Sequence, residues 1–128
     1  MGLFLNVAAL CDILLIIYYT FIIDKAGEFS LIFEWDENKN EANRIRHGVS
    51  FQEAETVFDD KNAVFLYDSQ HSVNEERFII IGLDALFREL TVCHCYRGKD
   101  EDIVRIISAR KATKNERTIY YGGINNEG

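Results

Sequence analysis

The hydrophobic pattern divides the chain near residue 30. Between Leu3 and Ile23, 18 of 21 residues are apolar, and only Asn6, Asp12 and Thr20 interrupt the run. A helix of this length can span a bilayer, and its apolar residues outweigh the cost of about 3 kcal/mol that a central Asp adds on an insertion scale. No Lys or Arg precedes the run, which disfavours a secretory signal peptide. The pattern therefore predicts a hydrophobic N-terminal extension over residues 1–30.

A strand and two short helices are predicted directly after this extension. Residues 33–35 alternate apolar and polar, as in a half-buried strand, and Asp36 can cap the amides of a following helix. Gly48 ends that helix, because glycine adopts the left-handed conformation without steric cost. Ser50 and Glu53 then have the spacing of a capping box, so a second helix begins at this point.

The remaining pattern predicts four strands and a closing helix. Short links between apolar, β-branched segments are typical of consecutive antiparallel hairpins. The expected strands are Ala63 to Tyr67, Arg77 to Asp84, Arg88 to Tyr96 and Ile103 to Ala109. Residues 111–121 read as a helix, with Ala112, Ile119 and Tyr120 facing the sheet, and residues 122–128 as a tail. The predicted order is β-α-α-β-β-β-β-α with an antiparallel sheet, an α+β fold in one domain over 31–121.

Charge argues against a broad nucleic-acid-binding surface. The 128 residues carry 14 Lys and Arg against 21 Asp and Glu, a formal net charge of −7, whereas nucleic-acid binders usually have a basic footprint. The end of the chain is locally basic, from Arg105 to Arg117. A basic cleft on an acidic body would neutralise few phosphates, so we expect weak, salt-sensitive binding.

The cysteines favour a reducing compartment and give no metal site. Their number, three, does not suit a disulfide framework. Cys93 and Cys95 flank His94 in a predicted strand, so the two thiols share one face and the imidazole the other. Tetrahedral zinc needs at least three protein ligands. We therefore expect buried cysteines that pack as small hydrophobes, with no metal and no cofactor.

Several motifs occur in a fixed order and carry a family resemblance. After residues 33–54 come Glu75-Glu76-Arg77-Phe78, Gly82, Arg88, and Arg105 to Ala112 with Glu116-Arg117 and Tyr120. In this order they resemble the BrnT family of bacterial type II toxins over roughly residues 31–121. Ile-Ser-Ala-Arg-Lys-Ala at 107–112 is the most specific of them.

The resemblance implies a function, a fold and partners. It implies a compact RelE-like toxin fold and a cytoplasmic endoribonuclease that acts on RNA. It also implies a BrnA antitoxin of the ribbon-helix-helix class, which would neutralise the toxin in a hetero-oligomer and make any DNA contact itself. Two other functions remain open: a binding module that keeps the antitoxin interface without catalysis, and a protein anchored in the inner membrane through Leu3 to Ile23, with its C-terminal domain in the cytoplasm.

The start of the resemblance also bears on the N-terminal extension. UUG and CUG can serve as start codons, and either codon is translated as leucine when it lies inside a longer reading frame. Leu31 could therefore mark such a start codon. Natural initiation at Leu31 is thus one interpretation, beside a membrane helix and an accessory helix packed on the domain.

Metal-independent RNA cleavage assigns three tasks to side chains. A general base takes the 2′-hydroxyl proton, cations stabilise the crowded phosphorane, and an acid protonates the leaving 5′-oxygen. Charged residues within the motifs are the candidates: His47, Glu76, Arg77, Arg105, Arg110 and Lys111. The arginines suit phosphate, because a guanidinium is a planar fork that stays charged. His47 or Glu76 would be the base, and His47 or Lys111 the acid.

Each candidate also has a structural interpretation. His47 precedes a helix-ending glycine, where an imidazole often interacts only with the last carbonyls. Glu76 can simply hold Arg77 in place. Arg105 can form an ion pair with Glu76 or Glu89 at a sheet edge. Arg110 and Lys111 can merely complement the acidic surface. His71 and His94 are expected to be a solvated loop residue and a sheet residue.

Overall fold

The computed structural model describes residues 31–125, so the expectations for residues 1–30 lie outside the described chain. The elements in chain order are β1 (Ile32–Glu34), α2 (Glu37–His47), α3 (Phe51–Glu55), the 3-10 helix η1 (Thr56–Asp59), β2 (Val64–Tyr67), the 3-10 helix η2 (Ser69–His71), β3 (Phe78–Leu83), β4 (Glu89–Arg97), β5 (Ile103–Lys111) and α4 (Lys114–Asn125). The α+β class is confirmed. No helix within residues 31–125 is long and apolar enough to cross a bilayer.

The capping residues act as predicted. The Asp36 side chain accepts hydrogen bonds from the backbone amides of the next turn, at 2.8 and 3.1 Å. Gly48 ends α2 with φ of 71°, in the left-handed region. Ser50 and Glu53 form the reciprocal capping box, with distances of 3.0 and 2.9 Å. The first third of the domain is therefore specified by local sequence.

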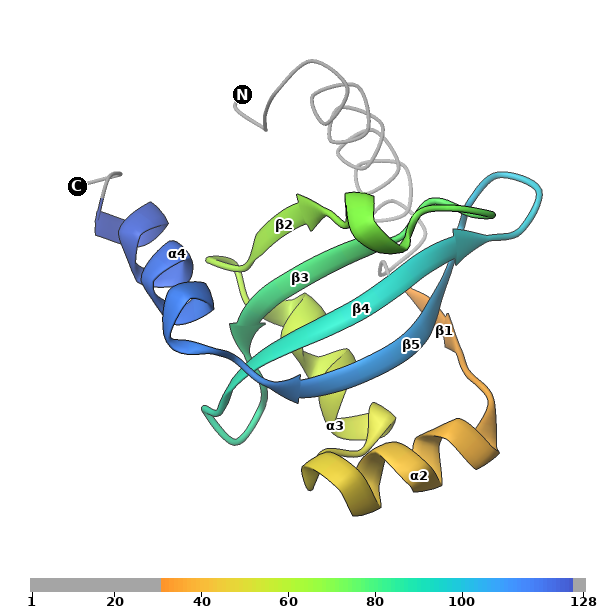
Figure 1. The fold of residues 1–128 in the computed structure, drawn as a ribbon, viewed down its shortest axis with the longest axis horizontal. Coiled ribbons are helices and arrows are strands. Elements are labelled where there is room, and N and C mark those ends of the chain that lie inside the picture. The colour runs from red at the N-terminus through yellow and green to blue at the C-terminus, as the bar shows by residue number, and fades with distance from the viewer. Residues whose placement is uncertain (1–30, 126–128) are drawn as a thin grey trace, which may run out of the picture. The chain divides into compact units, whose positions relative to one another are not determined.

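The five strands form one sheet in the order β1-β5-β4-β3-β2 (Figure 1). Strands β2 to β5 form the predicted antiparallel meander. The prediction of an entirely antiparallel sheet was wrong, because β1 runs parallel to β5, with Glu34 opposite Arg105. Helices α2 and α3 carry the chain away from β1 before the meander begins, so the meander can return its last strand alongside β1 in the same direction.

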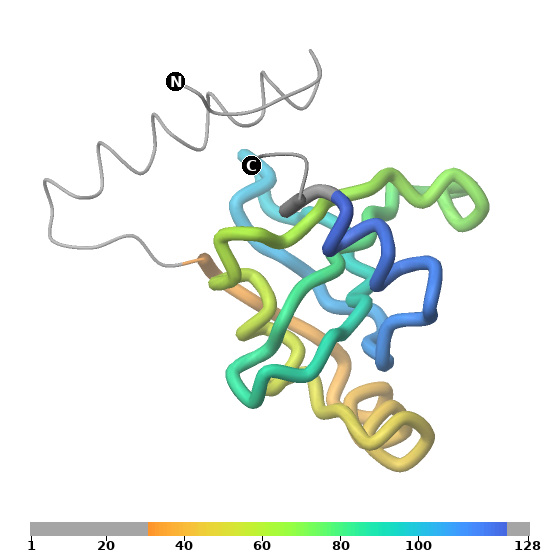
Figure 2. The backbone as a smooth tube through the Cα atoms, turned by 90° about the vertical axis from the view of Figure 1, so that its left-hand side faces the viewer, coloured from red at the N-terminus to blue at the C-terminus, as the bar shows by residue number. Residues whose placement is uncertain are grey.

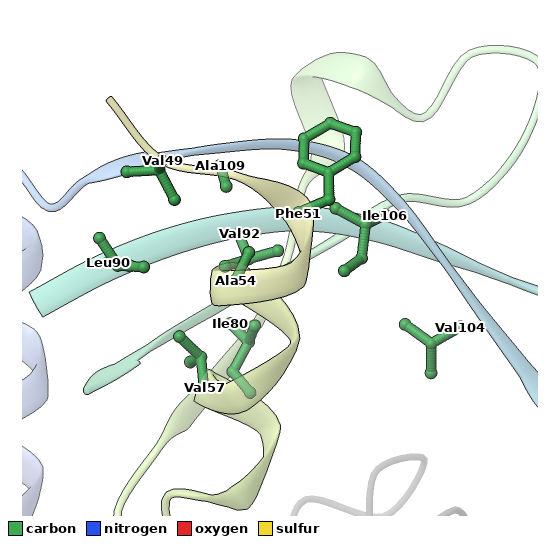
Figure 3. Close-up of a cluster of buried hydrophobic side chains, with 10 residues drawn as sticks. All are labelled: Val49, Phe51, Ala54, Val57, Ile80, Leu90, Val92, Val104, Ile106 and Ala109. Carbon is green, nitrogen blue, oxygen red and sulfur yellow. The ribbon is translucent and has the colours of Figure 1, made fainter. Parts of the chain in front are cut away.

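The main core lies between one face of the sheet and the helices α3 and η1 (Figure 3). Figure 2 shows α3 on one side of the strands and α4 on the other. Ten buried side chains fill this core: Val49, Phe51, Ala54, Val57, Ile80, Leu90, Val92, Val104, Ile106 and Ala109. His94 is also fully buried on this side, with its ring against Phe58 and Phe78, so the interpretation as a sheet residue is confirmed.

A second, smaller core lies on the opposite face of the sheet, which we call the α4 face because α4 packs there. Ala112 and Tyr120 are buried against Ile81, as predicted for two of the three helix positions. The prediction for Ile119 was wrong, since it is 42% exposed. Strand β5 continues to Lys111, so α4 starts three residues later than predicted and its inward face shifts with it.

Candidate nucleic-acid interface

One row of side chains crosses all five strands on the α4 face, at the end of the sheet where β3 begins and β4 ends. Strand pairing places Glu34 opposite Arg105, and Arg105 opposite Cys95. Phe78 pairs with His94, so the preceding Arg77 lies beside Cys95. At the far edge, the Asp68 amide donates to the Arg77 carbonyl at 2.9 Å. The row is therefore Asp68, Arg77, Cys95, Arg105 and Glu34, which we call the transverse row.

Three arginines in or next to the transverse row lie beside two glutamates and stay partly exposed. Arg105 donates to Glu34 at 2.9 Å. Arg97, at the end of β4, forms an ion pair of 3.0 Å with Glu75, which also lies 3.5 Å from Arg77 Nε. The side chains of Arg77, Arg97 and Arg105 are 31, 45 and 32% exposed, so none of the three is fully buried.

Arg77 has hydrogen-bonding capacity to spare. Its Nε is close enough to Glu75 for charge attraction but forms no hydrogen bond. Among the described residues it is the one buried side-chain nitrogen or oxygen without a partner. An unpaired buried donor costs about 1–3 kcal/mol and calls for an explanation. Glu75 therefore holds Arg77 by charge attraction and not by a hydrogen bond from Nε.

The thiols of this face are uncharged at neutral pH. Burial raises the pKa of Cys93 to about 11, and the nearby Asp68 charge adds to the effect. Burial also raises the pKa of Cys95, although Arg97 and Arg105 oppose the shift. A neutral thiol is a poor nucleophile and metal ligand, so these cysteines pack as small hydrophobes. Within the described residues, no three His, Cys, Asp or Glu side chains form a group that could hold a metal.

Arg110 also lies on the α4 face, because β5 is irregular. Cys93 pairs with Ser108, whereas the next residue, His94, pairs with Ile106, so the register slips by one. Arg110 is engaged in a bidentate ion pair with Glu116, at 2.7 and 2.9 Å. Glu116 in turn accepts from Thr91 at 2.8 Å. Arg110 thus ties β5 to α4, at the end of the sheet opposite the transverse row.

Three of the predicted site residues make no side-chain contact with these arginines in the part of the chain that the structure describes. His47 ends α2, and the Arg88 guanidinium donates to the next carbonyl, Gly48, so this end of the helix lies by the β3–β4 turn. Lys111 follows Arg110 in β5, is exposed and points to the other face. Glu76 is exposed and has no side-chain hydrogen bond or ion pair within the described chain; Glu75, its neighbour, holds Arg77 instead.

The suggested ion pair of Arg105 with Glu76 or Glu89 was wrong, because the partner is Glu34. Sequence reasoning also missed Arg97 and the pair formed by His71 and Asp68. His71 Nδ1 lies 2.9 Å from Asp68 Oδ2, so His71 is not merely a solvated loop residue. The one local signal was the spacing of three residues between an acidic side chain and a histidine in the loop between two predicted strands.

Comparison with known proteins identifies the fold and the family of this chain. A crystal structure of the Brucella abortus ribonuclease toxin, BrnT, matches with a TM-score of 0.50 and 22% identity, covering 66% of this chain and all of the other. At that identity the match establishes the fold. No curated protein sequence matches. The sequence profile of the ribonuclease toxin BrnT of type II toxin-antitoxin systems matches residues 35–116, well over half of the chain. The chain belongs to the BrnT family of ribonuclease toxins of type II toxin-antitoxin systems.

Proposed function

We propose that this toxin cuts RNA by attack of a ribose 2′-hydroxyl on the adjacent phosphate, on the α4 face at the transverse row. The observation that carries the proposal is the gathering of Arg77, Arg97 and Arg105 at one end of that face, partly exposed. Arginine suits this task because its fork matches two phosphate oxygens and stays charged. The cluster stands in a chain whose formal net charge is −7, with 14 Lys and Arg against 21 Asp and Glu.

The arginine nearest the reacting phosphate is expected to stabilise its charge, and the other arginines are expected to bind neighbouring phosphates of the RNA. The phosphorane formed during cyclisation carries more negative charge on its oxygens than the starting phosphodiester does. Donors fixed before the reaction stabilise that extra charge without reorganising. Arg105 is oriented by Glu34, and Arg97 by Glu75, so both guanidiniums are held in place before RNA arrives. Phosphate oxygens then compete with these carboxylates for the guanidinium groups.

A type II toxin implies an antitoxin partner, and we infer that it is a BrnA-like ribbon-helix-helix protein. In this proposal the DNA contact belongs to the antitoxin, because the toxin's net charge of −7 does not favour a broad contact with DNA. We also retain the RelE-like assignment of the fold as a prediction. Arg110 stabilises the position of α4, and His47, Glu76 and Lys111 are outside the proposed centre.

The proposal is tested by inducing the full chain in bacterial cells and following growth and total RNA. Arg105→Ala should abolish growth arrest and RNA cleavage. Arg46→Ala is the matched control, since Arg46 is an exposed arginine of α2 without a side-chain hydrogen bond or ion pair in the described chain. Wild type and the control should arrest growth, and a ribbon-helix-helix protein encoded beside the toxin should relieve the arrest.

Two results would count against the proposal. If the wild-type chain leaves growth and RNA untouched but still binds that antitoxin, the chain is an antitoxin-binding module without catalysis. If Arg105→Ala folds and cuts RNA as well as wild type, the transverse row is not the site.

A further inference from the structure

We infer that His71, oriented by Asp68, is the general base that takes the proton from the attacking 2′-hydroxyl. The inference rests on the proposed function and adds to it the group that the arginines cannot supply. Arginine stays protonated at any relevant pH and cannot accept a proton. An imidazole is suited to this role, because its charge changes near neutral pH.

The geometry of the pair presents one ring nitrogen to solvent. His71 Nδ1 lies 2.9 Å from Asp68 Oδ2, and the side chains are 62% and 10% exposed. The carboxylate is therefore largely buried, whereas the ring projects outward. A carboxylate on Nδ1 favours the tautomer whose proton sits there, which leaves the Nε2 lone pair free to accept a proton. Nε2 has no partner among the described side chains.

Hydrogen bonds hold the turn that carries the ring. Ser72 Oγ donates to the Asp68 carbonyl at 2.6 Å and accepts from the Arg77 amide at 2.9 Å. The His71 amide donates to the Asp68 carbonyl at 3.3 Å, closing the 3-10 turn η2. One hydroxyl thus joins the turn to the start of β3. The backbone that carries His71 is thus attached to the backbone of Arg77, as suits a base and a phosphate-binding cation that act together.

The position of Asp68 and His71 at one end of the transverse row indicates which phosphate of the RNA would react. Asp68 lies directly across from Arg77 on the α4 face. Its charge helps to raise the pKa of the Cys93 thiol, which lies on the same face. Arg105 is three strands from Asp68, about 14 Å at ordinary strand spacing. The scissile phosphate would therefore lie over Arg77, beside His71, and Arg105 would bind phosphate further along the RNA. The other charged groups near this position are Glu75 and Arg97, which form an ion pair with one another.

The reaction balances without a metal or a co-reactant. His71 Nε2 takes the 2′-hydroxyl proton as the 2′-oxygen bonds to phosphorus. The bond from phosphorus to the 5′-oxygen breaks, and that oxygen takes a proton from solvent. His71 then returns its proton to solvent. The products are a 2′,3′-cyclic phosphate and a 5′-hydroxyl end, and no water is consumed.

The rival bases are less well placed. His47 lies near the β3–β4 turn, at the other end of the sheet from Arg77. Glu76 is exposed and no neighbouring side chain orients it. His71 alone among the three combines exposure with a buried carboxylate partner and a fixed link to Arg77.

The test follows the rate at which 5′-hydroxyl RNA ends appear in a translating bacterial extract supplied with purified full-length chain. His71→Ala should lower this rate by about 10²- to 10⁴-fold, the usual contribution of a general base. Added imidazole should restore part of the rate to His71→Ala and none to Arg105→Ala. Gln70→Ala is the control, because Gln70 is exposed on the same turn and makes no side-chain hydrogen bond or ion pair in the described chain.

Asp68 is a positioning residue, so its test compares Asp68→Asn in the wild-type chain with Asp68→Asn in the His71→Ala chain. Asp68→Asn should slow the wild-type chain but cause no further loss in the His71→Ala chain, because it acts through the imidazole. If Asp68 had a purely structural role, Asp68→Asn would lower the cleavage rate by the same factor in the wild-type chain and in the His71→Ala chain.

The cleavage rates of the variants distinguish a failure of this inference from a failure of the proposed function. If Arg105→Ala is inactive while His71→Ala cuts at the wild-type rate, the base is another group and the inference is wrong, although the site stands. The same holds if His47→Gln abolishes cleavage and His71→Ala does not. If the wild-type chain produces no 5′-hydroxyl ends, the proposed function itself fails.

Discussion

Glu34 and Arg105 lie opposite one another where β1 and β5 pair in parallel, and their side chains meet at 2.9 Å. The contact joins residues 71 positions apart, between the first and last strands of the domain. It fixes the direction of a guanidinium that would otherwise sample many rotamers in solvent. The ion pair itself adds little stability, because both partners are about a third or more exposed. Its effect is on the orientation of Arg105.

Removing Arg97 should reduce the salt dependence of RNA binding. Each phosphate contact on a single strand contributes about 0.7 to the slope of log K against log salt. With Arg97→Ala we expect a slope smaller by about 0.7, measured by fluorescence anisotropy on RNA carrying 2′-O-methyl groups, which cannot cyclise. Arg46→Ala should leave the slope unchanged. An equal slope for both variants would mean that Arg97 contacts no phosphate.

Acid should loosen the attachment of α4 through Glu116. The hydrogen bonds from Arg110 lower the pKa of Glu116 from its ordinary 4.5 to about 2. A pKa that is lower in the folded chain means that ionisation favours folding. This contribution is complete above about pH 4.5 and is lost as the pH falls towards 2. Urea unfolding between pH 6 and pH 2.5 should show a steeper loss of stability for wild type than for Glu116→Gln. Parallel curves would contradict this account.

Asn43 should be important for stability although nothing in the sequence marks it. Its amide donates to the carbonyls of Ala109 and Val49, at 2.7 and 2.9 Å, and its oxygen accepts from the Ala109 amide at 3.1 Å. Asn43→Ala leaves buried backbone groups unpaired, at about 1–3 kcal/mol each. Urea unfolding should show a loss of at least about 2 kcal/mol. Asn38→Ala, at an exposed position on the same helix, should show none.

Tyr120 should anchor α4 more strongly than its neighbour Tyr121. The Tyr120 hydroxyl donates to Asp60 Oδ2 at 2.7 Å, and burial raises the pKa of this phenol well above its ordinary value. Tyr120→Phe should lower the free energy of unfolding by about 1.5–3 kcal/mol, as for a buried hydrogen bond to a charged group. Tyr121→Phe is the control, because Tyr121 is exposed and its bond to Glu89 competes with water. Equal losses would contradict a special role for the buried phenol.

Local signals in the sequence predicted local structure well. Asp36, Gly48 and the capping box of Ser50 with Glu53 depend on residues within four positions, so they can be read from the chain directly. The hairpins of the meander follow in the same way from alternating apolar runs and short links. The parallel pairing of β1 with β5 depends on contacts across most of the domain, and no local pattern encodes it.

The site was harder to predict because it depends on register. The slip in β5 places Arg110 on the face of Arg105, although five positions along a regular strand would put them on opposite faces. Glu75 and Glu76 differ by one position in a loop, and only the fold decides which one meets Arg77. Motif membership found Arg77 and Arg105 but not Arg97, whose role arises from the end of β4 meeting Glu75.

The central claim is that Arg77 and Arg105 are needed for RNA cleavage through the 2′-hydroxyl. The most direct test of this claim is to identify the chemical groups at the new RNA ends. RNA from induced cells is ligated by a reaction specific for 5′-hydroxyl ends, and the new ends are counted by sequencing. Wild type should generate many such ends, and the Arg77→Ala/Arg105→Ala chain, at equal protein level, at least about 100-fold fewer. New ends carrying 5′-phosphate, or equal numbers of 5′-hydroxyl ends from both chains, would contradict the account.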